Sequence, residues 1–332
     1  MPDSSLLEIK NLSVGFKNAY GVARVVDGID VSVARGEIVG IVGESGCGKT
    51  VTVLSVMGLL PGTGWTSGEI LFGGEDLLKK NDDEMRAIRG DRISMIFQEP
   101  MTALNPVMTI GRQICEPLML HKSATRSDAA RRAVEILDLV RVPQASMRMK
   151  SYPHQLSGGL CQRAMIAMAL ICEPMLLIAD EPTTALDVTI QAQILSLLLD
   201  LKERLGTTIL MITHDLGVVA ELCDRVYVMY AGHIMEEADV RELFARPLHP
   251  YTSGLLRSLP RVDGGANCER HLYSIPGMVP GLGEVRGGCP FEPRCESAMK
   301  RCGVSMPPLN PVFAGHNARC WLFGESASDA AR

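Results

Sequence analysis

Short apolar segments rich in β-branched residues alternate along the chain with longer stretches of helical periodicity. An uninterrupted apolar run of about five residues is typical of a strand buried on both faces, and parallel sheets consist of such strands. Parallel strands also need a crossover, usually a helix, between them. The pattern therefore predicts an α/β fold with a parallel sheet. The predicted strands are 38–42, 93–97, 175–179, 208–213 and 225–229.

A helix is predicted over residues 128–140, between the strands at 93 and 175. Ser127 is the candidate N-cap, since a hydroxyl can accept a hydrogen bond from the first turn. Apolar positions then recur every three or four residues, which places them on one face. These positions are Ala130, Ala133, Val134 and Leu137. We therefore expect a helical subdomain at about 99–172.

The composition of the chain changes near residue 260. Residues 261–288 are rich in Gly and Pro, and four of the ten cysteines follow between 289 and 320. We therefore predict one large domain over 1–260 and a loop-rich C-terminal extension over 261–332.

Composition and charge exclude several classes of protein. Hydrophobic residues make up 46% and charged residues 21%, which is ordinary for a folded domain. A net charge of −5 argues against nucleic-acid binding, which needs a basic surface. Residues 1–7 lack a basic and apolar signal, and the longest apolar run, 164–172, is too short to span a bilayer. We expect a cytosolic chain whose thiols stay reduced.

A phosphate-binding loop directly follows the predicted strand 38–42. Its pattern is G-x-x-x-x-G-K-[ST], in which glycines let backbone N–H groups point at phosphate oxygens. The lysine contacts the β- and γ-phosphates of the nucleotide, and the final hydroxyl coordinates Mg²⁺. We interpret the cysteine within the loop as a packed side chain. The loop consists of Gly43, Glu44, Ser45, Gly46, Cys47, Gly48, Lys49 and Thr50.

A second half of the site is predicted where the apolar segment 175–179 ends in Asp180 and Glu181. Adjacent side chains at a strand end point in different directions. Asp180 can therefore hold Mg²⁺ while Glu181 polarises the attacking water, as in other P-loop NTPases.

The segment Leu156-Ser157-Gly158-Gly159, followed by Gln162 and Arg163, separates this chain from P-loop NTPases in general. Its place shortly before the Asp180 strand resembles the signature motif of ABC ATPases. The resemblance covers roughly residues 5–325 and implies a P-loop NTPase nucleotide-binding domain of the ABC type, which binds and hydrolyses ATP.

Other family elements occur in the expected order. Tyr20 resembles the aromatic residue that stacks on adenine, with Phe16 as its competitor, and Gln98 resembles the Q-loop glutamine that helps to hold Mg²⁺. Asp187 lies in the D-loop position, and His214 resembles the switch histidine that contacts the γ-phosphate.

The resemblance also implies a dimer. In ABC ATPases the P-loop of one subunit faces the signature motif of the other across ATP, and this chain has one of each. It therefore needs a second ATPase subunit, either a paralogue in a heterodimer or a second copy of itself.

Two segments resemble the ATPases of oligopeptide and dipeptide importers. They are 99–106, after Gln98, and 249–256, which begins His249-Pro250-Tyr251-Thr252. We assign packing roles to His249 and Tyr251. The resemblance implies two transmembrane permease subunits, a periplasmic or lipid-anchored solute-binding protein, and a peripheral position on the cytoplasmic face of the bacterial inner membrane.

Four cysteines of the extension are spaced by five, six and seventeen intervening residues. This spacing fits neither common zinc modules nor the bacterial ferredoxin run. By the residues alone they could bind an iron–sulfur cluster, bind zinc or remain unliganded, and the family resemblance favours a [4Fe–4S] cluster that staples the extension. They are Cys289, Cys295, Cys302 and Cys320.

Other functions remain open at this point. The same family contains nickel and glutathione importers, so the sequence does not determine the transported molecule. A soluble ABC ATPase acting on DNA or ribosomes is a different class, but such proteins carry coiled-coil insertions or two fused ATPase units. An exporter ATPase is commonly fused to membrane spans, which this chain lacks.

Overall fold

The computed structural model describes residues 5–18, 21–184, 187–259, 273–281 and 287–323. Tyr20 and Cys268 lie outside these residues. The chain divides into two compact units. The first unit comprises 1–7, 33–38 and 71–212, and the second comprises 8–32, 39–70 and 213–332. Each unit is described separately.

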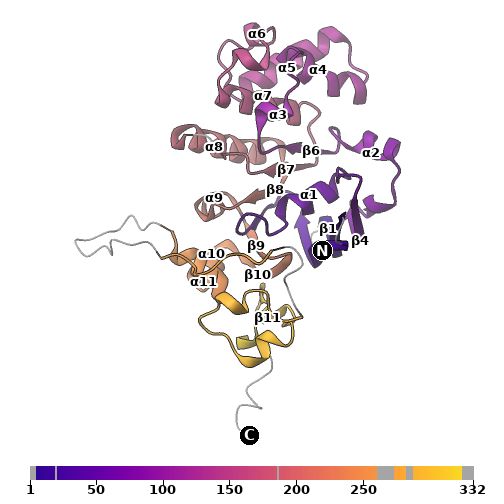
Figure 1. Ribbon diagram of the computed structural model, residues 1–332. Coiled ribbons are helices and arrows are strands. Elements are labelled where there is room, and N and C mark those ends of the chain that lie inside the picture. The colour runs from indigo at the N-terminus through magenta and orange to yellow at the C-terminus, as the bar shows by residue number, and fades with distance from the viewer. Residues whose placement is uncertain (1–4, 19–20, 185–186, 260–272, 282–286, 324–332) are drawn as a thin grey trace, which may run out of the picture. The chain divides into compact units, whose positions relative to one another are not determined.

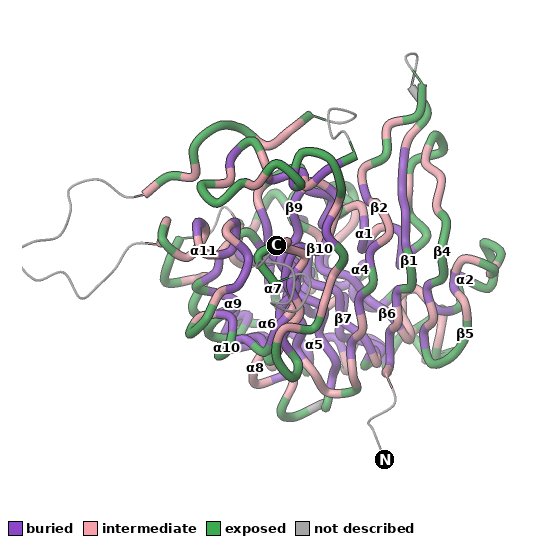
Figure 2. Tube along the Cα trace, turned by 90° about the horizontal axis from the view of Figure 1, so that it is seen from below, coloured by how far each residue is buried: buried purple, intermediate pink, exposed green. Residues whose placement is uncertain are grey.

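The first unit is built on three parallel strands in the order β8-β7-β6. They are β6 (Ile93–Ile96), β7 (Leu176–Asp180) and β8 (Thr208–Thr213), and all of their residues are buried. Figure 2 shows β6 and β7 buried along their lengths. The parallel strands predicted from continuous apolar runs are thus confirmed here, and burial on both faces is the physical reason for those runs.

Between β6 and β7 the chain forms helices that pack against one another (Figure 1). This arrangement follows the expected helical insertion, but α5 begins earlier than its sequence pattern indicated. Thr125 is the N-cap, not Ser127, because the Thr125 hydroxyl accepts from the Asp128 N–H. The helices are α3 (Pro100–Ala103), α4 (Ile110–His121), α5 (Arg126–Leu139), α6 (Ala145–Arg148) and α7 (Gly158–Leu170).

The earlier start shifts the buried face of α5. The helix buries Ala129, Ala133, Ile136 and Leu137, so Ala130 and Val134 lie at the edge of that face and not at its centre. The unit also contains α2 (Asp82–Ile88), α8 (Val188–Leu205), and the short strand β5 (Glu75–Asp76), which pairs with the end of β4 (Gly64–Phe72).

The second unit combines a sheet and the C-terminal segment. Strand β3 (Ile38–Val42) runs parallel to β9 (Arg225–Tyr230), and β10 (His233–Asp239) is antiparallel to β9. Strand β12 (His316–Ala318) pairs with β10, and β11 (Asn310–Phe313) pairs with β12. The extension therefore covers the edge of β10, whose backbone groups would otherwise be unpaired.

This unit also contains strands of a second sheet and further helices. Strands β1 (Ser5–Asn18), β2 (Gly21–Ala34) and β4 form a separate sheet in the order β2-β1-β4. The helices are α1 (Lys49–Val56), α9 (Leu216–Leu222), α10 (Val240–Ala245) and α11 (Pro250–Arg257).

A fully buried carboxylate, Glu236, joins three parts of the second unit. It accepts hydrogen bonds from the backbone N–H groups of Leu248 and His249, at 2.7 and 2.8 Å. Its Oε1 also lies 2.7 Å from Nε2 of His316 on β12. Because a buried charge is costly unless it is paired, this arrangement fixes β12 and the start of α11 against β10.

We predict that His249 makes the second unit sensitive to acid. His249 caps α11, its Nδ1 accepts from the Tyr251 N–H at 3.0 Å, and burial lowers the pKa of the imidazole to about 4. Between pH 6.5 and 4 the unfolded chain binds a proton that the folded chain does not, so stability falls by up to about 3 kcal/mol as pH decreases.

The test is the variant His249→Asn, which keeps a cap acceptor but cannot titrate. Urea unfolding followed by circular dichroism at pH 7.5 and pH 5 should show a smaller loss of stability than in the wild type. The exposed His154→Asn should retain the wild-type loss. An unchanged pH dependence in His249→Asn would contradict the prediction.

Candidate functional site

The phosphate-binding loop joins β3 to α1 through a turn that needs glycine at two places. A Cβ atom on Gly43 would lie 2.1 Å from the carbonyl oxygen of Met229 on β9. Gly48, the N-cap of α1, has a φ of 109°, which L side chains rarely adopt. Gly48 has no side chain that could cap α1, and a helix start of this kind suits an anion.

The side chain of Lys49 folds back onto the phosphate-binding loop. Its Nζ donates to the carbonyl oxygens of Gly43 at 2.7 Å and Glu44 at 3.1 Å, and the residue is buried. Cys47 is also fully buried, as expected of a packed thiol, and burial raises the pKa of that thiol. The loop is thus closed around its lysine by its own carbonyl groups.

The carboxylates Asp180 and Glu181 lie where the sequence predicted, at the end of β7. Asp180 is buried and Glu181 is half-buried with a φ of 46°. A non-glycine residue in this left-handed region is uncommon and is found at many functional sites. The backbone N–H of Glu181 donates to Ile212 at 2.8 Å, which fixes the residue beside the end of β8.

Two side chains orient the Glu181 carboxylate. Gln98 Nε2 donates to Glu181 Oε2 at 3.0 Å, so the structure brings together two residues that are 83 positions apart in the chain. Thr184 Oγ1 donates to the same oxygen at 2.8 Å. The sequence analysis did not identify Thr184, although its place three residues after Glu181 is typical of a turn.

The signature segment forms the N-terminus of α7. Ser157 is the N-cap, and Ser157 and Gly158 are exposed. A Cβ atom on Gly159 would lie 3.2 Å from Ile190 of α8, whose N-cap is Asp187. The Asp187 side chain accepts from the Ile190 N–H at 2.9 Å. The structure therefore places the signature and Asp187 at neighbouring helix starts.

Gln162 and Arg163 have structural roles within this unit. Gln162 is buried and donates to the Pro182 carbonyl at 2.7 Å, which connects α7 to the segment after Glu181. Arg163 donates to the Val140 carbonyl and to Gln193, both at 2.7 Å.

His214 follows β8 and belongs to the second unit, as does the phosphate-binding loop. It is exposed, and the next residue, Asp215, caps α9 by accepting from the Gly217 N–H at 2.7 Å.

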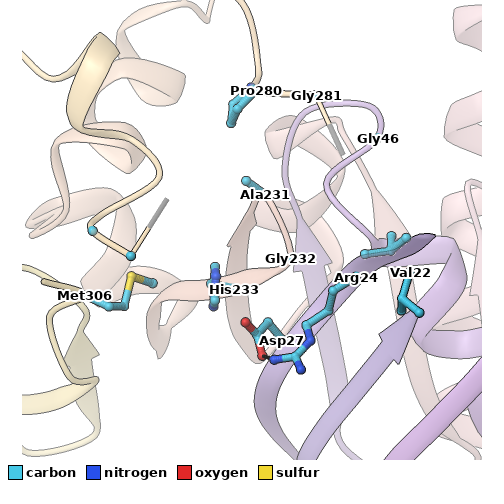
Figure 3. A pocket seen from close by; sticks show the side chains of 13 residues that line it. Val22, Arg24, Asp27, Gly46, Ala231, Gly232, His233, Pro280, Gly281 and Met306 are labelled. Carbon is cyan, nitrogen blue, oxygen red and sulfur yellow. Dashed lines mark hydrogen bonds and ion pairs between the residues drawn. The ribbon is translucent and has the colours of Figure 1, made fainter. Parts of the chain in front are cut away.

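A cavity of about 390 Å³ lies beside the tip of the phosphate-binding loop (Figure 3). Arg24 and Asp27 of β2 form an ion pair of 2.6 Å at its wall. The backbone of Gly232 joins this wall to the loop, since its carbonyl accepts from Asp27 and its N–H donates to Cys47, both at 2.9 Å. The cavity is also lined by Gly46 and by Pro280, Gly281 and Met306 of the extension.

Two residues from the C-terminal part of the chain, Tyr251 of α11 and Arg294 of the extension, also contact the phosphate-binding loop directly. His249 and Tyr251 are buried, which agrees with the packing roles expected of them. In addition, the Tyr251 hydroxyl accepts a hydrogen bond from the Glu44 N–H at 2.9 Å, and Arg294 forms an ion pair with the Glu44 carboxylate at 2.6 Å. No local sequence pattern indicated these contacts.

The four cysteines of the extension line one small cavity of about 10 Å³, together with His249, Glu292 and Trp321. Burial raises the pKa of Cys289 to about 11, and it also raises the pKa values of Cys295 and Cys320. Within the described residues, no group of three or more His, Cys, Asp or Glu side chains is placed to hold a metal ion. The remaining described cysteines, Cys47, Cys115, Cys161, Cys172 and Cys223, are buried.

The comparisons identify the class of protein. Residues 26–184 match the family model described as ABC transporter, and residues 235–302 match the model described as oligopeptide/dipeptide transporter, C-terminal region. The solved dimeric structure of the ATP-binding cassette MJ0796 bound to ADP and Pi is similar, with 29% identity and a TM-score of 0.64. The match covers 71% of this chain and 99% of that one. The fold is that of an ABC ATPase.

Full-length relatives define the family more closely. The chain is 53% identical to a probable peptide ABC transporter ATP-binding protein of Sinorhizobium fredii, over 96% of each chain. It is 50% identical to the oligopeptide transport ATP-binding protein AppD of Bacillus subtilis, over 98% of this chain and 99% of that one. The oligopeptide transport ATP-binding protein OppD of Escherichia coli is 49% identical, with 96% and 93% covered.

The chain therefore belongs to the family of ABC transporter ATP-binding proteins and is an ATPase. In the parts of the chain that the structure describes, none of the helices is both long and apolar enough to cross a bilayer.

Proposed function

We propose that this chain is the ATP-hydrolysing subunit of an importer for oligopeptides or dipeptides. The observation that carries the proposal is the match of residues 235–302 to the oligopeptide/dipeptide transporter C-terminal region, in a chain about 50% identical to named oligopeptide transport proteins. Importers of nickel, glutathione or another small solute are the alternative within the family.

We assign the ATP phosphates to the loop Gly43–Thr50. Its N–H groups and the positive end of α1 suit an anion, and Lys49 would move from its contacts with the loop carbonyls to the β- and γ-phosphates. The cavity beside the loop tip supports a place for the sugar and base, with Tyr20 stacking on adenine. His214 is assigned to the γ-phosphate.

The oxygen-rich side chains suit Mg²⁺. A buried carboxylate on Asp180, the hydroxyl of Thr50 and the amide oxygen of Gln98 are the hard donors that this ion prefers. Mg²⁺ would neutralise charge on the β- and γ-phosphate oxygens when ATP binds.

Glu181 is proposed as the residue that orients and deprotonates the attacking water. Its Oε2 accepts from Gln98 and Thr184, which orients the carboxylate for contact with a water molecule. The left-handed backbone of Glu181 and its bond to Ile212 restrict the carboxylate to this place. Because phosphoryl transfer depends mostly on positioning and charge, this restriction is part of the catalytic arrangement.

We propose that two ATPase subunits complete each site. The exposed Ser157 and Gly158 and the half-buried Gly159 would add hydroxyl and N–H contacts to the γ-phosphate held by the partner, with Asp187 beside them. The similar solved cassette is dimeric. A paralogous ATPase is the proposed partner, and a homodimer is the alternative.

The proposed permease contact lies on the helices that follow Gln98. Met101, Val107, Met119 and Leu120 are 50%, 80%, 43% and 72% exposed, so large apolar side chains face solvent in α3, in α4 and in the segment between them. Two permease subunits would dock there, with the chain peripheral on the cytoplasmic face of the inner membrane. A solute-binding protein would deliver the peptide from the other side.

For the extension, 261–332 in our domain assignment, we propose a [4Fe–4S] cluster held by Cys289, Cys295, Cys302 and Cys320. The donor chemistry suits a cluster, because four thiols line one cavity and thiolates are the ligands of such clusters, but in the described structure these thiols are not placed to hold a metal ion. The cavity has room for about one water, so the surrounding loops would have to adjust. When bound, the cluster would cross-link four positions of a loop-rich segment and so stabilise its fold. Zinc and unliganded thiols are the alternatives.

We predict that Glu181→Gln binds ATP with nearly wild-type affinity but hydrolyses it at least about 100-fold more slowly, because the general base is lost. Size-exclusion chromatography with ATP should show a persistent dimer, and phosphate release should show the loss of turnover. Glu173→Gln is a matched control, since Glu173 also has a positive φ of 55° in the same unit. Rapid multiple turnover by Glu181→Gln would contradict the assignment.

Purification of the tagged protein from gently solubilised membranes tests the importer proposal. We expect two multi-span permeases and a second ATPase to co-purify, and we expect the associated solute-binding protein to bind peptides and not nickel. Nickel binding alone would favour the alternative within the family. A soluble dimer without permeases, or one with ribosomal or DNA-bound partners, would contradict an importer.

Anaerobic purification followed by iron and sulfide analysis tests the cluster. We expect about four irons per chain, lost in Cys302→Ser together with a lower melting temperature. Cys115→Ser, a buried cysteine outside the extension, should keep the iron. Stoichiometric zinc without iron, or no metal in the wild type, would exclude the cluster.

A further inference from the structure

Arg294 connects the cysteine-bearing segment to the phosphate-binding loop. It ends a short 3₁₀ turn, Glu292–Arg294, and directly precedes Cys295. Its side chain is only 5% exposed, yet every part of the guanidinium is used. Nε donates to the Pro276 carbonyl at 2.9 Å, and Nη1 and Nη2 donate to the two oxygens of the Glu44 carboxylate at 2.6 and 3.1 Å.

This pairing is bidentate and largely shielded from water. Two parallel N–H···O bonds fix both the distance and the plane of a carboxylate, which a single ammonium contact does not do. The hydrogen bond to Glu44 raises the pKa of Arg294 above its already high usual value, so the guanidinium remains charged. An ion pair in this setting is more costly to break than an exposed one.

Glu44 is held at a second point by Tyr251 of α11, which precedes the extension. Its backbone N–H donates to the Tyr251 hydroxyl at 2.9 Å, while its carbonyl accepts from Lys49 Nζ at 3.1 Å. Arg294 and Tyr251 therefore fix the side chain and the N–H of Glu44. The carbonyl of the same residue accepts a hydrogen bond from Lys49, the lysine that must reach the phosphates.

The groups that hold Glu44 are themselves immobilised by packing. Tyr230, Tyr251 and Phe291 form a buried aromatic cluster with ring centroids 4.6 to 5.3 Å apart. The Tyr230 hydroxyl lies 3.3 Å from Arg294 Nη1. Dense aromatic packing of this kind leaves few alternative rotamers, so Arg294 and Tyr251 present a fixed surface to the loop.

We propose that Arg294 is a positioning residue for ATP binding: through Glu44 it fixes the conformation of the phosphate-binding loop, and the C-terminal extension is thereby a working part of the nucleotide site. The residue does not touch the reacting atoms. Its contribution is to hold the loop backbone in the form that binds phosphate, so that less ordering is needed when ATP arrives. The proposal does not depend on whether the cysteines hold a cluster or on which solute is imported.

The test compares Arg294→Gln with a matched ion-pair variant, Arg225→Gln. Arg225 pairs with Glu237 at 2.7 Å in the same unit, with both side chains mostly buried, and Glu237 lies outside the phosphate-binding loop. With the purified full-length chain, we expect Arg294→Gln to raise the Kd for a fluorescent ATP analogue and the KM for ATP at least about fivefold, with kcat within about twofold. Arg225→Gln should lower the melting temperature without changing the Kd.

Further variants separate positioning from folding. Arg294→Lys keeps the charge but not the two-point geometry, so its Kd should lie between those of the wild type and Arg294→Gln. Glu44→Gln should weaken binding by a similar factor, and the double variant Glu44→Gln/Arg294→Gln should be no weaker than either single one. Hydrogen exchange at the loop amides should be faster in Arg294→Gln than in Arg225→Gln.

Two results would overturn the proposal. One is a wild-type Kd for ATP in Arg294→Gln, or in the more conservative variants Arg294→Lys and Glu44→Gln. The other is an equal rise of Kd in Arg225→Gln, because Arg294 would then affect ATP binding only through the general stability of the unit. Wild-type protein that fails to bind ATP would refute the ATPase instead, so the two failures are distinguishable.

Discussion

The arrangement of the second unit depends on the tight turn by which β3 passes into α1. The turn packs against β9 so closely that Gly43 has no space for a side chain, and Gly48 adopts a backbone conformation suited to glycine. Backbone bonds from Gly232 align the same turn with β2 and β9. A loop that must enclose phosphate with N–H groups has few side chains to stabilise it, so the surrounding strands supply that support.

The C-terminal segment is part of this support. Its strands continue the sheet beyond β10, and the buried Glu236 binds α11 and β12 to that strand. The same segment then reaches the loop through Tyr251 and Arg294. The composition of the chain changes near residue 260, and we drew a domain boundary there. In the folded chain, however, the residues on both sides of that boundary belong to the same compact unit as the phosphate-binding loop.

The first unit contains residues proposed for Mg²⁺ binding and water activation, together with the signature motif. Gln98, Asp180 and Glu181 lie at the ends of β6 and β7, and the signature begins a helix joined to the segment after Glu181 by Gln162. Carboxyl ends of parallel strands are the usual place for such residues, because loops there converge on one edge of the sheet. The functional residues of the unit are thus positioned by the buried strands β6 and β7 and by the buried side-chain amide of Gln162.

The sequence by itself determined the parallel strands, the phosphate-binding loop, the carboxylates after β7 and the family, because these depend on local patterns of apolar runs, glycines and charged residues. It misplaced the start of α5, since both Thr125 and Ser127 can cap a helix, and in the folded chain the Thr125 hydroxyl makes the capping contacts with Asp128. Thr184 beside Glu181 also required the folded turn. The ion pair between Glu44 and Arg294 joins residues 250 positions apart, and only the tertiary structure decides such a contact, because its partners have no local pattern in common.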